Sequence, residues 1–166
     1  MGNLNLNIKK AIPNPSPKGA PVPKRFPLDE ERHSRTVKFK VHAGSSDGSR
    51  LVEGYFTVGM YNDGCPGELF IWVDREGSET HGWANSWSKA ISMLLQYGIH
   101  PADIYERFEH INFEPKGVTN VKSAPICKSV IDMIIKYMKA NFPPTGNFND
   151  TDGYNSIIQA VIEEED

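Results

Sequence analysis

Alternating apolar and polar residues predict three β-strands in the first half of the chain. In residues 36–42 every second side chain is apolar and those between them are polar, which is the period of a strand with one buried face. The alternation recurs in residues 51–61 and 68–73, and the turn at Asn62-Asp63-Gly64 joins these two runs, as expected of an antiparallel meander. Gly54 and Gly59 in the second run predict a bulge or a close backbone approach.

The period changes to that of an α-helix after residue 82. The apolar stripe of residues 82–97 consists of Trp83, Trp87, Ile91, Leu94 and Leu95, and the opposite stripe of Asn85, Ser88, Lys89, Ser92 and Gln96. This spacing predicts an amphipathic helix with the first stripe buried and the second exposed. Ser78 or Thr80 is expected to cap the helix, and Gly98 to end it.

Two further helices are predicted in residues 101–110 and 124–141, with a loop over residues 111–120 between them. Pro101 is expected to open the first of these helices and Ser123 to cap the second. The second is apolar around much of its circumference, which predicts burial on two sides and a homo-oligomer. The predicted fold class is α+β, with an antiparallel meander of three or more strands packed against two or three helices.

Composition divides the chain into three parts. Residues 1–24 hold five prolines within eleven positions, Pro13, Pro15, Pro17, Pro21 and Pro23. They predict an extended arm, either loosely docked or exchanged with a neighbouring subunit. Residues 25–142 carry the α+β domain. Residues 143–166 form a polar and acidic extension, in which residues 154–162 could form a short helix.

Net charge and sequence patterns exclude several classes of protein. The formal net charge of the 166 residues is −3, so we expect neither a broad basic surface nor a nucleic-acid partner. The sequence has no apolar signal region and no run long enough to span a membrane, so we expect a cytoplasmic protein. Cys65 and Cys127 stand far apart and form no paired metal-binding motif, and their redox role stays open.

A glycine-bearing turn before the first predicted helix is a candidate anion site. Gly77 and Gly82 can adopt conformations that direct backbone amides toward one point, and a helix N-terminus attracts negative charge. Gly77, Ser78, His81 and Gly82 are therefore candidates for binding a phosphate group. The alternative is a tight connection that binds nothing.

A second alternative concerns the acidic residues around this turn. Four carboxylates cluster in this part of the sequence, Glu68, Asp74, Glu76 and Glu79. Such a cluster is either solvent-exposed or a divalent-cation site; we expect exposure and assign no metal site.

Five sequence blocks and a sixth short one together resemble a known domain. The blocks are D-G-x-P-G-E-L-F-I (63–71), E-G-S (76–78), A-I-S-x-x-L-Q-Y-G (90–98), F-E-P-x-G-x-T (113–119), K-S-V-I-D (128–132) and the opening K-R-F-P (24–27). In this order they resemble the TSCPD domain, found at the C-terminus of adenosylcobalamin-dependent (class II) ribonucleotide reductases. The resemblance covers residues 24–142.

The resemblance implies a role in deoxyribonucleotide metabolism and DNA synthesis. Adenosylcobalamin belongs to the reductase barrel, which has no counterpart here, so we expect no cofactor and no reductase activity in the isolated chain. The reductases' C-terminal cysteine pair also lacks a counterpart, and Cys127 stands where the reductase form usually has a small residue. We expect a non-catalytic module that binds a nucleotide or another phosphate-bearing ligand, or docks onto a reductase subunit.

Five further residues are candidates for completing the ligand site. They lie in the F-E-P loop and the following K-S block: Lys116, Gly117, Thr119, Lys128 and Ser129. Three alternatives stay open at this point. The chain could be a virus-encoded or bacterial protein that sequesters a signalling nucleotide, a small nucleotide-processing enzyme that uses His81 or Glu79, or an oligomerisation module without a ligand.

Overall fold

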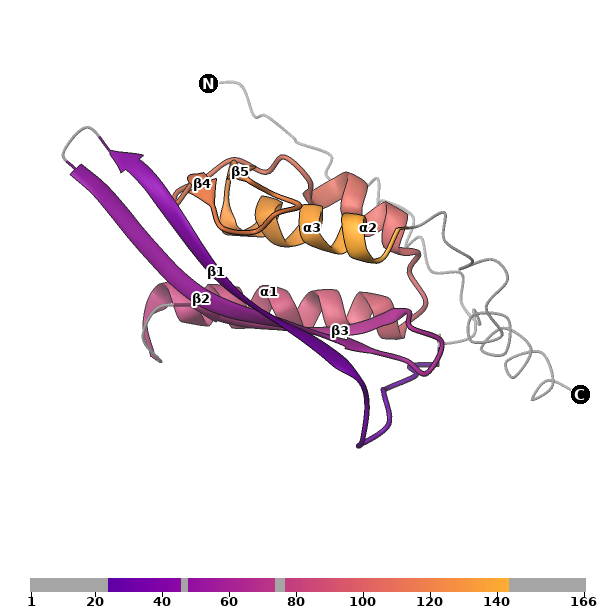
Figure 1. Ribbon diagram of the computed structural model, residues 1–166. Helices are drawn as coiled ribbons and strands as arrows, with labels where there is room; N and C mark the ends of the chain where they lie inside the picture. Colours follow the sequence, from indigo (N-terminus) through magenta and orange to yellow (C-terminus); the bar gives the residue numbers. More distant parts are fainter. Residues whose placement is uncertain (1–23, 46–47, 74–76, 144–166) are drawn as a thin grey trace, which may run out of the picture.

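The computed structural model shows an α+β fold, as predicted, and describes residues 24–45, 48–73 and 77–143 (Figure 1). The elements are β1 (Ser34–Ser45), β2 (Gly48–Met60), β3 (Pro66–Val73), α1 (Glu79–Gln96), α2 (Pro101–Phe108), β4 (Gly117–Thr119), β5 (Ile126–Cys127) and α3 (Val130–Asn141). The predicted arm up to residue 23 and the extension from residue 144, including its short helix, lie outside the described residues. Within those ranges no helix is long and apolar enough to cross a membrane.

The strands form one antiparallel sheet in the order β3-β2-β1-β4-β5. β1 and β2 pair along their whole length, from Ser34 opposite Gly59 to Ser45 opposite Gly48, and form the long hairpin seen in Figure 1. β3 pairs only with the second half of β2, and β4 pairs only with residues 41–43 of β1. Large parts of both outer edges of this hairpin therefore need other partners for their backbone groups.

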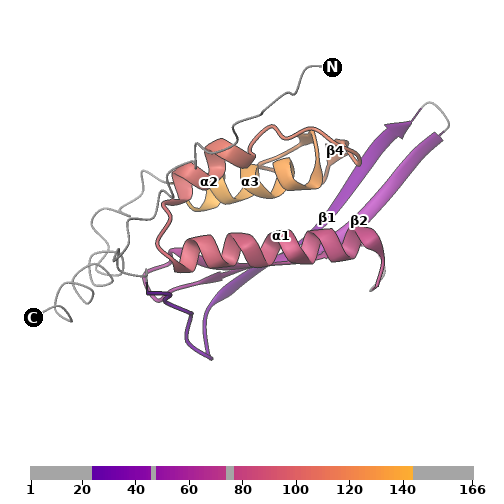
Figure 2. The same ribbon diagram turned by 180° about the vertical axis from the view of Figure 1, so that it is seen from behind.

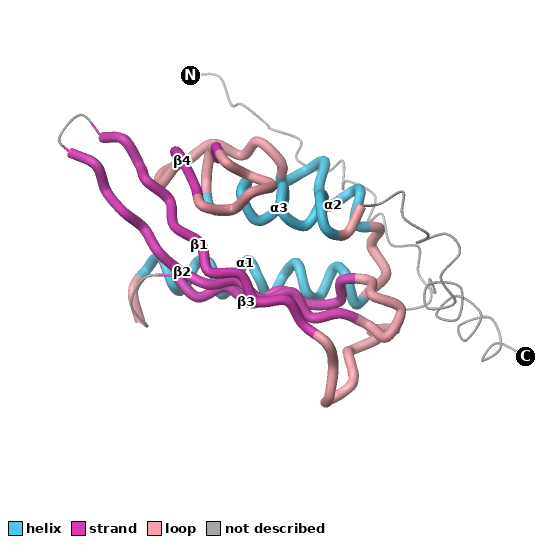
Figure 3. Tube along the Cα trace, in the orientation of Figure 1, coloured by secondary structure: helices cyan, strands magenta, loops and turns pink. Residues whose placement is uncertain are grey.

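The three helices complete a single hydrophobic core. α1 lies across the sheet in Figure 2, and α2 and α3 run side by side next to it in Figures 1 and 3. The apolar strand faces predicted from the alternation are buried in this core, including Phe39, Phe56 and Leu69. Gly54 confirms the predicted close approach, because a Cβ atom there would lie 2.4 Å from the carbonyl oxygen of Trp72.

α1 closes the free edge of β3 with polar side chains. The hydroxyl of Ser92 accepts a hydrogen bond from the backbone amide of Leu69 at 2.9 Å and lies 3.1 Å from the carbonyl oxygen of the same residue. One turn later, the side-chain amide of Gln96 donates to the carbonyl oxygen of Gly67 at 3.0 Å. The helix thus forms hydrogen bonds to the edge of β3 that a neighbouring strand would otherwise form. It also covers an edge that could pair with another chain.

This contact corrects the predicted orientation of α1. Trp83 is 71% exposed and Leu94 also lies at the surface, whereas Ser88 and Gln96, predicted to face solvent, are buried. The helix also begins at Glu79, with Ser78 as its cap, rather than at residue 82. Ile91 and Leu95 of the predicted apolar stripe are buried as expected, so periodicity located part of the buried face. It missed the polar groups that a helix must present when it meets a strand edge.

The segment after α2 differs more strongly from the prediction. Residues 111–120, predicted as a loop, contain β4, and residues 126–127, predicted as helix, form β5 opposite β4. α3 therefore begins at Val130, six residues later than predicted, and Ser129 rather than Ser123 caps it. Pairing of two short strands is a tertiary interaction that local periodicity does not report.

Replacing Ser92 with alanine should test the closure of the β3 edge. The change leaves the amide of Leu69 without its partner, and we expect a loss of about 1–3 kcal/mol of unfolding free energy, measured by urea denaturation. Ser86 is exposed on the same helix, so Ser86→Ala is the matched control and should be neutral or stabilising by up to about 0.5 kcal/mol. Equal effects of the two substitutions would contradict the edge-closing role.

Candidate functional site

The first set of predicted site residues lies at the start of α1. Gly77 has a φ of +83° and Ser78 caps the helix, but Gly82 lies within the helix rather than in a turn. The hydroxyl of Ser78 accepts a hydrogen bond from the amide of His81 at 3.1 Å, and its carbonyl accepts one from the amide of Gly82 at 3.0 Å. Two of the amides predicted to face a ligand thus have protein partners.

Aromatic side chains surround the same helix start. The ring of His81 packs edge-on against Trp72, with 5.1 Å between the ring centroids. The carboxylate of Glu79 accepts a hydrogen bond from the indole of Trp83 at 3.4 Å. His81 and Glu79, the residues considered for an enzymatic role, therefore contact aromatic rings.

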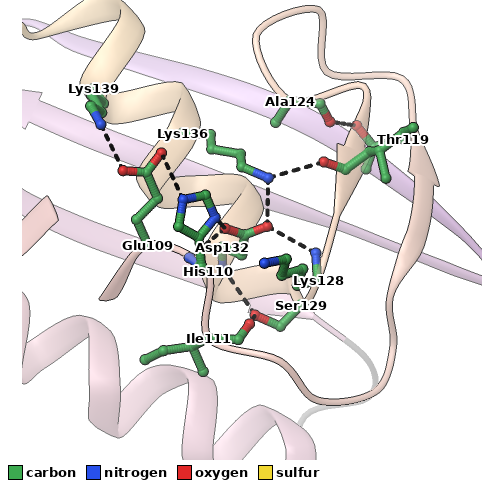
Figure 4. A network of polar contacts seen from close by, with 11 residues as sticks. Glu109, His110, Ile111, Thr119, Ala124, Lys128, Ser129, Asp132, Lys136 and Lys139 are labelled. Carbon is green, nitrogen blue, oxygen red and sulfur yellow. Dashed lines mark hydrogen bonds and ion pairs between the residues drawn. The ribbon is translucent and has the colours of Figure 1, made fainter. Parts of the chain in front are cut away.

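Two of the second set of predicted residues, Lys128 and Ser129, lie beside a buried carboxylate, that of Asp132 in α3 (Figure 4). It accepts hydrogen bonds from the backbone amides of His110 and Lys128 at 2.7 and 2.8 Å, and from the ammonium group of Lys136 at 2.8 Å. Burial alone would raise the pKa of Asp132, but these hydrogen bonds, led by that from Lys136, outweigh it and lower the pKa below its ordinary value. This carboxylate is therefore charged at neutral pH and fastens the segment after α2 and the segment after β5 to the start of α3.

Most of the predicted residues of this second set form hydrogen bonds or ion pairs within the protein. The hydroxyl of Ser129 donates to the carbonyl of Ile111 at 2.7 Å, and that of Thr119 donates to the carbonyl of Ala124 at 2.6 Å. Gly117 lies in β4, and Lys116 pairs with Glu114 at 3.4 Å. Lys128 contributes its backbone amide to Asp132, while its side chain is exposed.

His110 is a residue that the sequence analysis missed. It has a φ of +70°, an uncommon value for a residue other than glycine, and its ring is 60% exposed. Its two ring nitrogens lie 3.7 Å from a carboxylate oxygen of Asp132 and 3.9 Å from one of Glu109. Its positive φ places its amide on Asp132, which sequence spacing alone could not indicate.

The arrangement around His110 lacks a partner for nucleophilic catalysis among the residues described. The hydroxyls of Ser129 and Thr119 already donate to backbone carbonyls. The thiol of Cys127 is buried, and burial raises its pKa, which disfavours the reactive thiolate.

A cavity of about 470 Å³ opens between β1, residues 120–123 and α3. Its lining includes Lys38, Asn120, Lys122, Ser123, Tyr137 and Asn141, and contains no aspartate or glutamate. The cavity lies where β4 has ended. There the side chain of Asn120 accepts from the amide of Lys40 at 2.6 Å and donates to the carbonyl of Lys38 at 3.1 Å.

Patterns along the sequence do not indicate this cavity. They predict Lys38 on the polar face of a strand and Ser123 at a helix cap, and they give Asn120 and Lys122 no role. Lys38 is more than 80 positions away from Asn120, Lys122 and Ser123 in the chain, although the side chain of Asn120 bonds to the backbone of Lys38. No local spacing could have indicated that they line one cavity.

Comparison with known proteins supports the resemblance found in the sequence. A family model described as the TSCPD domain matches residues 23–142. A vitamin B12-dependent ribonucleotide reductase from Rhodopirellula baltica is 41% identical over 120 residues, which cover 72% of this chain and 11% of the relative. The reductase of the same name from Streptantibioticus cattleyicolor is 32% identical over 124 residues, which cover 75% and 19%. The chain thus spans less than a fifth of the length of these relatives, and no solved structure matches it.

Asp132→Asn should measure what the buried carboxylate contributes. The change removes the partner of Lys136 and sets an amide group against backbone amides, so we expect a loss of about 2–4 kcal/mol of unfolding free energy at pH 7. The folded-state pKa is lowered, so the charged carboxylate stabilises the fold above its unfolded-state pKa of about 3.9, and this contribution is lost as the pH falls through the lower folded-state value. The difference between the wild type and the variant should therefore shrink in acid.

The matched control is Asp103→Asn, since Asp103 is an exposed aspartate in the first turn of α2. It should cost less than about 1 kcal/mol. Denaturant unfolding of the three proteins between pH 7 and pH 3 gives the comparison. A variant at position 132 as stable as the wild type at pH 7 would show that the network is dispensable.

Proposed function

The chain belongs to the TSCPD domain family, and from this premise we propose that it is a non-catalytic module that binds a nucleotide or another phosphate-bearing ligand in deoxyribonucleotide synthesis. The observation that supports the proposal is the sequence similarity between this chain and ribonucleotide reductases. The relatives are named as vitamin B12-dependent ribonucleotide reductases. Those proteins therefore act on ribonucleotides and form deoxyribonucleotides. This chain corresponds to 11% and 19% of their lengths.

The state of the polar groups supports a non-catalytic role. Around Asp132, the hydroxyls that chemistry would require donate to backbone carbonyls instead. The carboxylate of Asp132 is completely buried and engaged by three donors. Groups held in this way stabilise a fold and are poorly available to a reacting substrate.

The distribution of charge supports a phosphate-bearing ligand. Lysines line the cavity beside β1 without any carboxylate in its lining, although the chain as a whole carries a formal charge of −3. Uncompensated cations around a cavity favour an anionic ligand.

The proposal can be tested without assuming a site. We expect small molecules released from the denatured, purified chain to include a nucleotide when analysed by mass spectrometry. We also expect isothermal titration calorimetry to detect binding of dATP or ATP, with deoxyadenosine, which lacks phosphate, as the matched control. Failure of every nucleotide tested to bind, or conversion of a bound nucleotide into product, would contradict the proposal.

A second candidate function is docking onto a reductase chain. The outward face of the sheet exposes aromatic side chains, with Tyr55 at 44%, Phe70 at 51% and Trp72 at 51% of their surface. Tyr55 and Trp72 are directly opposite each other in the β2–β3 register, and Phe70 is on the same face. A contiguous exposed apolar patch of this kind often marks an interaction site, and in the relatives the domain is part of a much longer chain. We therefore propose a reductase chain as the occupant.

Trp72→Glu should weaken this docking. We expect sedimentation velocity to detect a complex between the wild-type chain and the reductase of Rhodopirellula baltica, and to show its loss with the variant. Ile126→Glu is the control, since Ile126 is 68% exposed in β5 at the other end of the sheet. If Trp72→Glu loses only self-association, the face binds a second copy of the chain, as in the predicted homo-oligomer. If the wild type and both variants bind the reductase equally well, the face has no role in docking.

A further inference from the structure

The cavity beside β1 combines a basic rim, a polar wall and an apolar floor. We infer that this cavity is the ligand site of the chain and that it takes a nucleoside phosphate, with the phosphate at Lys122, Ser123 and Lys38 and the base against Tyr137. The inference rests on the proposed function, which it refines by naming the site and the class of ligand. It also moves the site away from the start of α1, where the sequence analysis had placed it.

Backbone geometry supplies the first donor. The amide and the carbonyl of Lys40 both bond to Asn120, so the polar groups of Lys40 point away from β2. In an antiparallel ladder, residues two apart on a strand point their backbone groups the same way. The amide of Lys38 therefore also points away from β2, toward the side of β1 on which the cavity lies, beyond the end of β4.

Side chains supply the other donors. Lys122 is exposed at the cavity and Ser123 is half-buried beside it. Arg35 adds a third positive charge at the rim, where its guanidinium group donates to the side-chain oxygen of Asn141 at 3.4 Å. The ammonium group of Lys38, a residue that also lines the cavity, lies 5.6 Å from the centre of the Tyr55 ring.

Charges of the opposite sign are fewer. α3 ends at Asn141 beside the cavity, and the partial negative charge of a helix C-terminus opposes an anion. This partial charge is smaller than that of one ammonium group, whereas Lys38, Lys122 and Arg35 carry full charges. The carboxylate of Glu53 in β2 is paired with Lys40 at 2.7 Å. The net field at the rim therefore favours phosphate.

The apolar floor distinguishes a nucleoside phosphate from phosphate alone. Tyr137, Val37 and Ala140 form it. The ring of Tyr137 packs edge-on against Phe56 in the core, with 5.0 Å between the ring centroids, so it is held in place as a rigid surface for a base to stack on. A volume of about 470 Å³ lies within the range of small-molecule sites, about 300–1,000 Å³, and exceeds what a single phosphate group needs.

Two substitutions in the cavity test its two halves. Lys122→Glu reverses a charge at the phosphate and should weaken dATP binding by at least about tenfold. Ala140→Trp fills the floor at an exposed position of α3 and should weaken dATP while leaving pyrophosphate affinity within about twofold. Both affinities are measured by isothermal titration calorimetry on the full chain, and circular dichroism checks that each variant is folded.

Two controls carry the same kinds of change elsewhere. Lys116→Glu alters an exposed lysine outside the cavity lining, and Gly82→Val adds a side chain at the start of α1, where an added Cβ atom would meet no other atom within 4 Å. Both should change dATP affinity by less than about threefold. Loss of binding in Gly82→Val, or in Lys116→Glu, with full binding in the cavity variants would overturn the site and leave the proposed function standing. Absence of nucleotide binding to the wild type would overturn both.

Discussion

The pairing of backbone groups at the edges of the β1–β2 hairpin is the constraint on which this structure depends. The strands next to the hairpin are shorter than the hairpin itself, and an unpaired buried amide or carbonyl is costly. Side chains add hydrogen bonds at the outer edge of β3, the neighbour of β2, and at the outer edge of β1. Ser92 and Gln96 of α1 bond to β3 on one side, and Asn120 bonds to β1 on the other. The position of α1 and the end of β4 both follow from this requirement.

A second device, the buried carboxylate of Asp132, organises the other half of the domain. It binds backbone amides from the segments on either side of the β4–β5 hairpin and so holds that hairpin against α3. A buried charge is tolerated only when its hydrogen bonds are complete, and this one has donors on both oxygens. The neighbouring polar residues therefore contribute mainly to stability. This explains why several residues predicted to bind a ligand form hydrogen bonds within the protein instead.

Away from these two sets of contacts, the cavity beside β1 combines lysine side chains with a lining that contains no aspartate or glutamate. β4 stops at Thr119 because the chain must turn back to form β5, and Asn120 covers only the carbonyl of Lys38 and the amide of Lys40. On the side away from β2, the stretch of β1 before Lys40 has no neighbouring strand among the described residues, and it faces α3 across the cavity. Basic side chains gather there without carboxylates in the lining. The proposed ligand site thus lies where the pairing of β1 with β4 ends.

Local sequence patterns were enough to predict the α+β class, the three long strands with their buried faces and the turn at Asn62-Asp63-Gly64. They also predicted a cap at Ser78 or Thr80, and the structure has Ser78. These features depend on residues close together in the chain, and the block pattern of residues 24–142 likewise indicated the TSCPD family. The buried face of α1, the strands β4 and β5, the start of α3 and the cavity required the folded structure. Whether a polar side chain meets water or a strand edge depends on partners 23 residues away for Ser92 and 82 residues away for Asn120, and periodicity along one segment carries no record of such partners.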